Sequence, residues 1–200
     1  AFKFLTDTAA EFQAFQGGEV SAIYPSPEPD VVRTIKRGLG ANSSIFNADT
    51  GNIEALWMNN AAFPFNSVRV RQAVAYSINR EAIVRLLFSP LGVTHAANSL
   101  NPPILAPYSD QRAFAGYHRD LRKVNQLMTA DGWAKSGGIW QKNGRAAQFS
   151  IQSTAGDKRR ELTEQILQQQ LHQAGFTLTV DNKDANTLFG QVLPAGAFQT

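Results

Sequence analysis

Residues 56–84, LWMNNAAFPFNSVRVRQAVAYSINREAIV, constrain the fold more than any other part of this chain. The apolar run 56–58 ends at two asparagines, and Pro64 follows. Proline fixes its own φ and disfavours helix in the residue before it, so Pro64 restricts the turn. Ser67 and Asn79 are then suitable N-caps for two helices. The stretch predicts a strand, a proline-containing turn and two capped helices in succession.

Both predicted helices carry an apolar stripe at helical spacing. The stripe residues are Val70, Ala73, Val74 and Ile78 in the first helix, and Ile83, Val84 and Leu87 in the second. Glu81 lies in the first turn of the second helix, where a negative charge suits the helix dipole. Arg69 and Arg71 point to different faces of the first helix, so we expect a structural ion pair or solvent exposure for them.

The order of the other predicted elements indicates an α/β protein. Helices are expected at about 7–16, 31–37, 119–131 and 184–193, and one more, with Leu162, Ile166, Leu167 and Leu171 on its apolar side, ends at Gly175. Extended runs are expected at 19–24, 44–47, 53–58 and 176–180, with a further strand starting near Phe198. Asn143-Gly144 predicts a type I′ hairpin within 139–151, and the proline-rich residues 88–117 predict a long loop.

Composition bounds the class of protein without identifying it. A chain of 200 residues with 43% hydrophobic content can bury a core in one or two domains. It has no cysteine, and no apolar run reaches the roughly 18 residues needed to span a bilayer. The absence of a signal peptide and lipobox cysteine suggests an excised segment of a longer protein. Base-stacking aromatics do not interleave with the basic clusters at 69–71 and 158–160, so we expect solvated faces and no nucleic-acid partner.

The sequence offers no pattern typical of an enzyme. The three histidines, His95, His118 and His172, are far apart and form no metal-ligand spacing. The chain lacks a GxSxG elbow and a thiol nucleophile, and Gly38-Leu39-Gly40 lacks the third glycine of a dinucleotide fingerprint. We therefore expect no catalytic residue, no metal site and no cofactor in this chain.

The run N…PF-x-x-VRVRQA-x-x-x-x-x-NRE-x-I within 59–83 closely resembles the signature of family 5 extracellular solute-binding proteins, the peptide, dipeptide and nickel receptors of ABC importers. The similarity continues in 7–24, 119–133 and 161–180. Ser21 and Asn79 stand where the family usually has Asp, and either residue can serve as a local cap much as Asp does.

The resemblance implies a periplasmic-binding-protein type II-like α/β fold, a partial two-lobe architecture with mixed sheets flanked by helices. Residues 1–52 would form part of the first lobe as a β-α-β-α unit. Residues 53–60 would be a hinge crossover. Residues 61–200 would be the second, C-terminal lobe, truncated at its C-terminal side.

The implied function is that of the substrate-binding component of an ABC importer. Such a receptor binds peptides, here expected to be oligopeptides, or another small solute between its lobes and delivers them to the membrane permease subunits. The parent would lie at the extracellular or periplasmic face of the membrane as a lipoprotein, held only by a lipid anchor outside this chain. A non-transport sensor, a peptide-binding chaperone, and a receptor for a nickel chelate or heme are the alternatives.

Five residues are candidate ligand contacts by this resemblance: Tyr24, Pro25, Ser26, Trp57 and Asn59. Tyr24 offers an aromatic wall with a hydroxyl, and Ser26 a small donor or acceptor. The alternative for Tyr24 is a buried side chain at a strand end, and for Trp57 it is simple core packing. Asn59 could equally bond the backbone of the turn, as asparagine commonly does.

Overall fold

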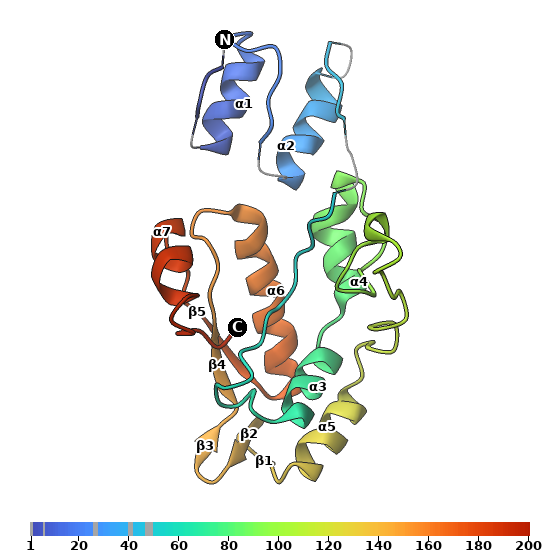
Figure 1. The fold of residues 1–200 in the computed structure, drawn as a ribbon, viewed down its shortest axis with the longest axis vertical. Helices are drawn as coiled ribbons and strands as arrows, with labels where there is room; N and C mark the ends of the chain where they lie inside the picture. Colours follow the sequence, from blue (N-terminus) through green and yellow to red (C-terminus); the bar gives the residue numbers. More distant parts are fainter. Residues whose placement is uncertain (1, 6, 26–27, 40–41, 47–49) are drawn as a thin grey trace.

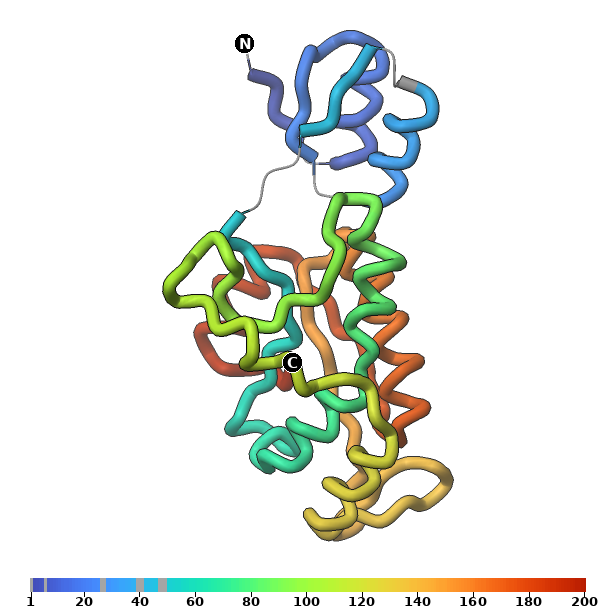
Figure 2. Tube along the Cα trace, turned by 90° about the vertical axis from the view of Figure 1, so that its right-hand side faces the viewer, coloured from blue at the N-terminus to red at the C-terminus, as the bar shows by residue number. Residues whose placement is uncertain are grey.

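The computed structural model describes residues 2–5, 7–25, 28–39, 42–46 and 50–200. An N-terminal part lies at one end of the long axis of the molecule, and a β-hairpin lies at the other (Figures 1 and 2). The N-terminal part contains α1 (Thr8–Gln16) and α2 (Pro29–Thr34), and α2 continues as a π-helical turn, Ile35–Leu39. Asp7 caps α1 by accepting a hydrogen bond from the Ala10 amide at 2.8 Å.

The main body, residues 61–200, holds the remaining helices. These are α3 (Val68–Ser77), α4 (Arg80–Ile83) with its π-helical continuation Val84–Phe88, α5 (Leu121–Ala130), α6 (Lys158–Ala174), and α7 (Ala185–Thr187) with its continuation Leu188–Val192. Short 3-10 turns occur at Ser89–Leu91 and Pro103–Leu105. The two signature helices and the long loop after them are therefore confirmed. The predicted side-chain cap at Ser67 is wrong, because Ser67 stands at the N-cap position of α3 but its hydroxyl donates to Asp131 Oδ1 at 2.9 Å and makes no capping bond. The Asn79 cap is also confirmed, since its side chain accepts from the Ala82 amide at 2.9 Å.

Five strands form two small sheets. The strands β1 (Ala134–Ser136), β2 (Ile139–Lys142) and β3 (Arg145–Ala146) pair antiparallel in that order. The strands β4 (Gln148–Ile151) and β5 (Thr177–Val180) pair in parallel, with Phe149 opposite Leu178. Both central residues of the turn have positive φ, 51° at Asn143 and 74° at Gly144, which confirms the type I′ prediction.

The predicted hairpin is too long, however. It stops at β3, and residues 148–151 leave it to pair with β5. Ala147 is the switch point: its amide donates to the Trp140 carbonyl at 2.8 Å, and its own carbonyl accepts from the Thr177 amide at 3.0 Å. One residue thereby joins the antiparallel sheet to the parallel pair.

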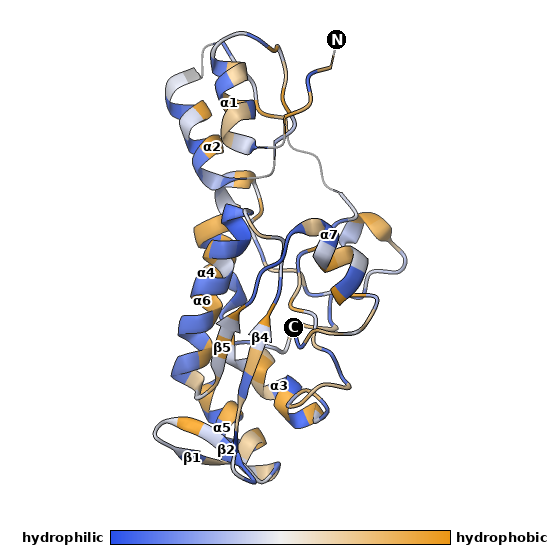
Figure 3. Ribbon diagram, turned by 90° about the vertical axis from the view of Figure 1, so that its left-hand side faces the viewer, coloured by the Kyte–Doolittle hydropathy of each residue, from blue (hydrophilic) through white to orange (hydrophobic). Residues whose placement is uncertain are grey.

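The core lies where α3, α5 and α6 meet one face of β4 and β5. Along β4 the apolar Phe149 and Ile151 are buried in this core, while Gln148 and Ser150 alternate with them and are more exposed. The ribbon of β4 accordingly carries both hydrophobic and hydrophilic residues (Figure 3). Phe149 packs edge-on against Phe65 with ring centroids 4.7 Å apart. Every residue of the two predicted helical stripes is buried. The helical predictions hold because periodicity and caps are local properties.

Three of the predicted strands do not form. Residues 19–24 and 53–58 pair in no ladder among the described residues, so the expected β-α-β-α unit has its helices alone there. The run 44–47 shows no ladder either in the part described, and Asn47 lies outside it. An extended segment becomes a strand only when a neighbour satisfies its backbone groups. Near the C-terminus, such pairing with β4 begins at Thr200, whose amide donates to the Ser150 carbonyl at 3.1 Å.

Arg80 fastens the long loop to the body. The Arg80 guanidinium donates to the carbonyls of Ala97 at 2.5 Å, Phe114 at 2.9 Å and Tyr117 at 3.3 Å. Burial lowers the pKa of Arg80, against the opposing effect of the Glu81 charge. The loop lies beside the segment that connects the N-terminal part to the body (Figure 2), where Leu105 approaches Gly51.

Candidate functional site

The crossover segment, residues 53–60, runs from the N-terminal part along the body (Figure 1). Its side chains alternate: Leu56 and Met58 pack against the core, while Trp57 is 58% exposed. Simple core packing is therefore not the environment of Trp57. The exposed indole leaves a large aromatic surface available on this segment.

Asn59 anchors the end of the crossover segment. Its Nδ2 donates to the carbonyls of Gly196 at 3.1 Å and Phe198 at 2.9 Å, and its Oδ1 accepts from the Ala61 amide at 3.0 Å. The Asn59 amide also donates to the Gln199 carbonyl at 2.9 Å. The expected bond to the turn backbone is present, and both Nδ2 protons are used within the protein.

The side chain of Gln199 forms a second set of hydrogen bonds in the same region. Its Nε2 donates to the Phe63 carbonyl at 2.7 Å, and its Oε1 accepts from the Ser150 amide at 2.9 Å. The C-terminal residues, the turn after the crossover segment and the edge of β4 are thus tied together by two amide side chains. No local pattern in the sequence marks Gln199 for this role.

A buried carboxylate organises the carboxyl ends of β4 and β5. Glu164 of α6 is 3% exposed and accepts from Ser153 Oγ at 2.7 Å and from Asn182 Nδ2 at 2.8 Å. Ser153 follows β4, and Asn182 follows β5. Ligands of open α/β sheets bind outside the carboxyl ends of parallel strands, so this edge is a candidate site by geometry. Glu164 itself is fully engaged in holding the edge.

An ion network lies next to this edge, at the start of α6. Arg159 pairs closely with Glu54 of the crossover segment, and its Nη2 lies 3.6 Å from Asp157 Oδ2. Arg160 Nε lies 3.6 Å from Glu54 Oε1 and 3.5 Å from Asp157 Oδ2. Arg159 is only 5% exposed and stacks 5.3 Å from the ring of Phe88. The expectation that this basic cluster is a solvated face is therefore wrong for Arg159.

The other candidate contacts lie in the N-terminal part. Tyr24 is 95% exposed, which excludes a buried strand-end tyrosine, and its amide donates to Glu11 Oε1 at 3.0 Å. Pro25 is half-buried, and Ser26 lies outside the described residues. Burial raises the pKa of Glu28, and the charge of Asp157 in the main body raises it further.

The structure does not join the candidates into one site. Tyr24 and Pro25 lie between α1 and α2, whereas Trp57 and Asn59 lie on the crossover segment. Among the described residues, no hydrogen bond or ion pair connects Tyr24 or Pro25 to the two candidates on the crossover segment. The sequence did not predict the ion pair of Glu54 with Arg159, because these residues are far apart in the chain.

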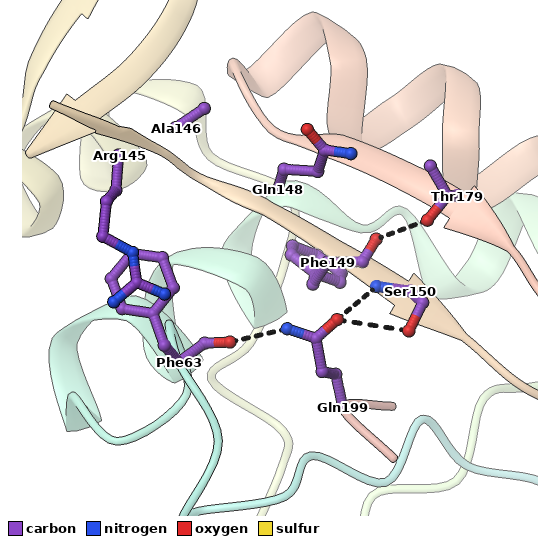
Figure 4. A pocket seen from close by; sticks show the side chains of 8 residues that line it. All are labelled: Phe63, Arg145, Ala146, Gln148, Phe149, Ser150, Thr179 and Gln199. Atoms are coloured by element: carbon purple, nitrogen blue, oxygen red, sulfur yellow. Dashed lines mark hydrogen bonds between the residues drawn. The ribbon is translucent and has the colours of Figure 1, made fainter. Parts of the chain in front are cut away.

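A depression of about 410 Å³ lies on the polar face of β4 and β5 (Figure 4). The Arg145 guanidinium covers the Phe63 ring at 3.6 Å on one side, and Thr179 and Gln199 contribute to the remaining lining. None of the candidate residues that the structure describes lines it.

Two further observations concern metals and membranes. In the described ranges, no group of three His, Asp or Glu side chains is arranged to hold a metal ion. None of the described helices combines the length and the apolar character that crossing a membrane requires.

Comparison with known proteins identifies the family. Residues 1–199 match the sequence model of one protein family, the bacterial extracellular solute-binding proteins, family 5, in its middle region. The chain belongs to this family. The members of this family are extracellular solute-binding proteins.

Curated relatives in this family have different named solutes. The oligopeptide-binding protein OppA of Lactococcus lactis subsp. cremoris is 30% identical over 121 residues, which are 60% of this chain and 20% of that protein. The nickel-binding periplasmic protein of Escherichia coli is 22% identical over 195 residues, 95% of this chain and 36% of that protein. The chain therefore spans well under half the length of these relatives.

Solved structures confirm the predicted fold class. NikA from Brucella suis, in complex with Fe(III)-EDTA, superposes with a TM-score of 0.74 at 21% identity over 98% of this chain and 39% of NikA. The oligopeptide-binding protein AppA from Bacillus subtilis, in complex with a nonapeptide, gives 0.73 at 22% identity over 94% of this chain and 36% of AppA. The chain thus has part of the type II periplasmic-binding-protein fold.

Proposed function

We propose that the protein is the substrate-binding component of an ABC importer, binding peptides, oligopeptides above all, between two lobes and delivering them to membrane permease subunits. Membership of the solute-binding family over residues 1–199 carries this proposal. Curated relatives named for oligopeptides and for dipeptides, at 30% and 27% identity, support the peptide class.

The proposed lobes follow the expected division. Residues 1–52 belong to the first lobe, 53–60 to the hinge crossover and 61–200 to the second lobe. The Asn59 anchor supports this division, because it fixes the downstream end of the crossover to the main body. Bending is then concentrated upstream of Asn59. The ligand stabilises the closed arrangement because only there do both lobes contact it.

The proposed ligand contacts are Tyr24, Pro25, Ser26 and Trp57, with Asn59 acting on the ligand through the backbone that it holds. The exposure of Tyr24 and Trp57 supports this, since two aromatic side chains facing solvent are free to cover a ligand. Peptide recognition uses the backbone hydrogen bonds that every peptide shares, with wet pockets for its side chains. Such recognition gives broad specificity.

We further propose that the protein acts at the extracellular or periplasmic face of the membrane, as a lipoprotein with its anchor outside the 200 residues. The family's extracellular designation supports the location. The anchor is testable by metabolic labelling of the full-length protein with a fatty acid.

A non-peptide solute is the second candidate, and two relatives favour it. The Escherichia coli nickel-binding protein aligns with 95% of this chain, and the heme-binding protein A of Haemophilus influenzae is 33% identical over 82 residues. A nickel chelate or heme would occupy the same space between the lobes.

Mass spectrometry of the native cargo separates these candidates. The full-length protein is purified without added ligand and denatured, and the released small molecules are identified. A ladder of short peptides of mixed sequence is the expected result. A single metal chelate, heme or another non-peptide compound would refute the peptide class and leave the fold assignment intact.

A further inference from the structure

The helical segment that begins with α4 ends at carbonyls that have no α-helical donor. After α4 the chain continues through the π-helical turn Val84–Phe88 and the 3-10 turn Ser89–Leu91, and Gly92 ends the segment with φ 91°. In an α-helix the Leu86 carbonyl would accept from the amide of residue 90, but Pro90 has no N–H. The Pro90 carbonyl lies in the last turn, where helical donors run out. This end therefore presents acceptors and the negative end of a helix dipole.

Two cations of the N-terminal part lie at this end. The helix α2 packs against the 3-10 turn Ser89–Leu91, and its end lies next to the end of the α4 segment in Figure 1. Arg33 Nη2 donates to the Leu86 carbonyl at 3.5 Å, and Lys36 Nζ donates to the Pro90 carbonyl at 3.4 Å. Cations are favourable at a helix C-terminus, because the dipole and the last carbonyls are negative there. Here the cations come from the opposite end of the crossover segment.

Arg33 is oriented by its own helix. Its Nη1 donates to Asp30 Oδ1 at 2.7 Å, so the two ends of the guanidinium serve different partners. Both Arg33 and Lys36 are exposed, so each contact with the α4 segment is individually weak and sensitive to salt. What distinguishes these contacts is that they join a helix before the crossover segment to a helix after it.

We propose that Arg33 and Lys36 are positioning residues, which dock α2 on the C-terminal end of the α4 segment and thereby favour the lobe placement of this structure. This inference rests on the lobe division of the proposed function, in which α2 belongs to the first lobe and α4 to the second. A cation at a helix C-terminus typically changes an equilibrium constant by a factor of about 1.7 to 5. The two together should favour this placement by about 3- to 25-fold.

The docking has two consequences for binding. A solute that needs both lobes binds a placement that can close on it, so its apparent affinity depends on the population of that placement. The two cations thus act on binding without touching the solute. Ionic strength should also change the lobe placement, because exposed charges act over about 30 Å at 0.01 M salt and only about 3 Å at 1 M.

The test measures the distance between two spin labels on the full-length protein, freed of bound solute. This chain has no cysteine, so the labels are placed at Gln13→Cys on α1 and Ser136→Cys on β1, both exposed positions. Any cysteine elsewhere in the full-length protein is replaced by serine. The distance distribution then reports how the first lobe is placed on the second.

Three double variants separate docking from a general effect of charge. Arg33→Gln/Lys36→Gln removes both docking charges. Arg37→Gln/Arg122→Gln is the matched control, because it removes two exposed positive charges whose side chains make no hydrogen bond or ion pair within the part of the chain that the structure describes. Arg33→Lys/Lys36→Arg keeps both charges and is the conservative rescue. All the substituted positions are exposed, so each variant should fold.

At about 0.01 M salt we expect a broadened or displaced distribution for Arg33→Gln/Lys36→Gln, and the wild-type distribution for the control and the rescue variant. At about 1 M salt the charge-loss variant and the wild type should converge, because the docking charges are then screened. A wild-type distribution in Arg33→Gln/Lys36→Gln at low salt would overturn the proposal. So would an equal displacement in the control, or a difference from the wild type that persists undiminished at high salt.

This readout needs no ligand, so its result is independent of the cargo analysis. Peptide cargo with an unaltered distance distribution refutes the docking role of Arg33 and Lys36 alone. An altered distribution with non-peptide cargo refutes the peptide class alone.

Discussion

Replacing Asn59 by Asp tests whether the end of the crossover segment is anchored as the structure shows. The substitution keeps the size of the side chain and the oxygen that accepts from the Ala61 amide. It removes both Nδ2 donors and places a carboxylate oxygen against the carbonyls of Gly196 and Phe198. The backbone bond from Asn59 to Gln199 is retained. The loss is therefore confined to two hydrogen bonds and a new repulsion.

The expected cost follows from where these bonds lie. A hydrogen bond contributes about 0.5–1.5 kcal/mol net, so the exposed bond to Gly196 is assigned the lower value and the part-buried bond to Phe198 the upper one. The sum is about 2 kcal/mol, and repulsion between the carboxylate and the carbonyls adds to it. With a urea m value of about 2 kcal/mol per molar, the unfolding midpoint falls by about 1 M.

The assay is urea unfolding followed by tryptophan fluorescence at neutral pH, with Asn60→Asp as the matched control. Asn60 is exposed and its replacement introduces the same charge one residue away. We expect Asn60→Asp to leave the midpoint near the wild-type value. Equal midpoints for Asn59→Asp and Asn60→Asp would refute the anchor. At acidic pH the penalty at residue 59 should shrink, because a protonated carboxyl regains one donor.

Three further predictions concern stability. Burial opposes ionisation of Asp131, but hydrogen bonds from Ser67, Trp133 and Lys142 outweigh it and lower its pKa below the ordinary 3.8. A lowered pKa gives stability that is present above the ordinary value and lost as pH falls through the folded one. Acid unfolding should therefore be shallower in Asp131→Asn, and identical pH profiles would contradict this. Phe149→Ala, at a fully packed core position, should cost about 3–5 kcal/mol in the free energy of unfolding, and a loss under about 1 kcal/mol would exclude tight packing. Gly175 has φ 96°, and a Cβ there would lie 2.9 Å from the Trp140 ring, so Gly175→Ala should cost more than about 1–2 kcal/mol in thermal unfolding. Gly190→Ala is its control, because a Cβ at Gly190 meets nothing within 4 Å, and equal losses in the two variants would refute the steric argument.

The helices of the main body were predictable because their determinants are local. Apolar spacing in α3 and the Asn79 cap of α4 lie within a few residues of one another, and both are confirmed. The path of β4 was not predictable in this way. Whether residues 148–151 continue a hairpin or join β5 depends on a partner that follows a whole helix later. Alternation alone gives a strand its faces but not its neighbour.

In the candidate site, too, local features were predictable and contacts between distant segments were not. Family resemblance directed attention to the crossover segment, where Trp57 and Asn59 lie. The pairing of Glu54 with Arg159 could not be inferred, because it joins two distant segments of the chain. A cluster of three basic residues is usually solvated, whereas Arg159 packs near the Phe88 ring, pairs with Glu54 and is 5% exposed.

The way in which Arg80 holds the long loop has a consequence for how this surface can evolve. Three of the groups that accept from its guanidinium are main-chain carbonyls, which every residue possesses. The attachment is therefore largely blind to the side chains at those positions. Mutations can accumulate along residues 93–116 without releasing the loop, as long as Arg80 and the local chain path are kept. Substitutions there would change the surface of the loop one residue at a time and leave its attachment in place.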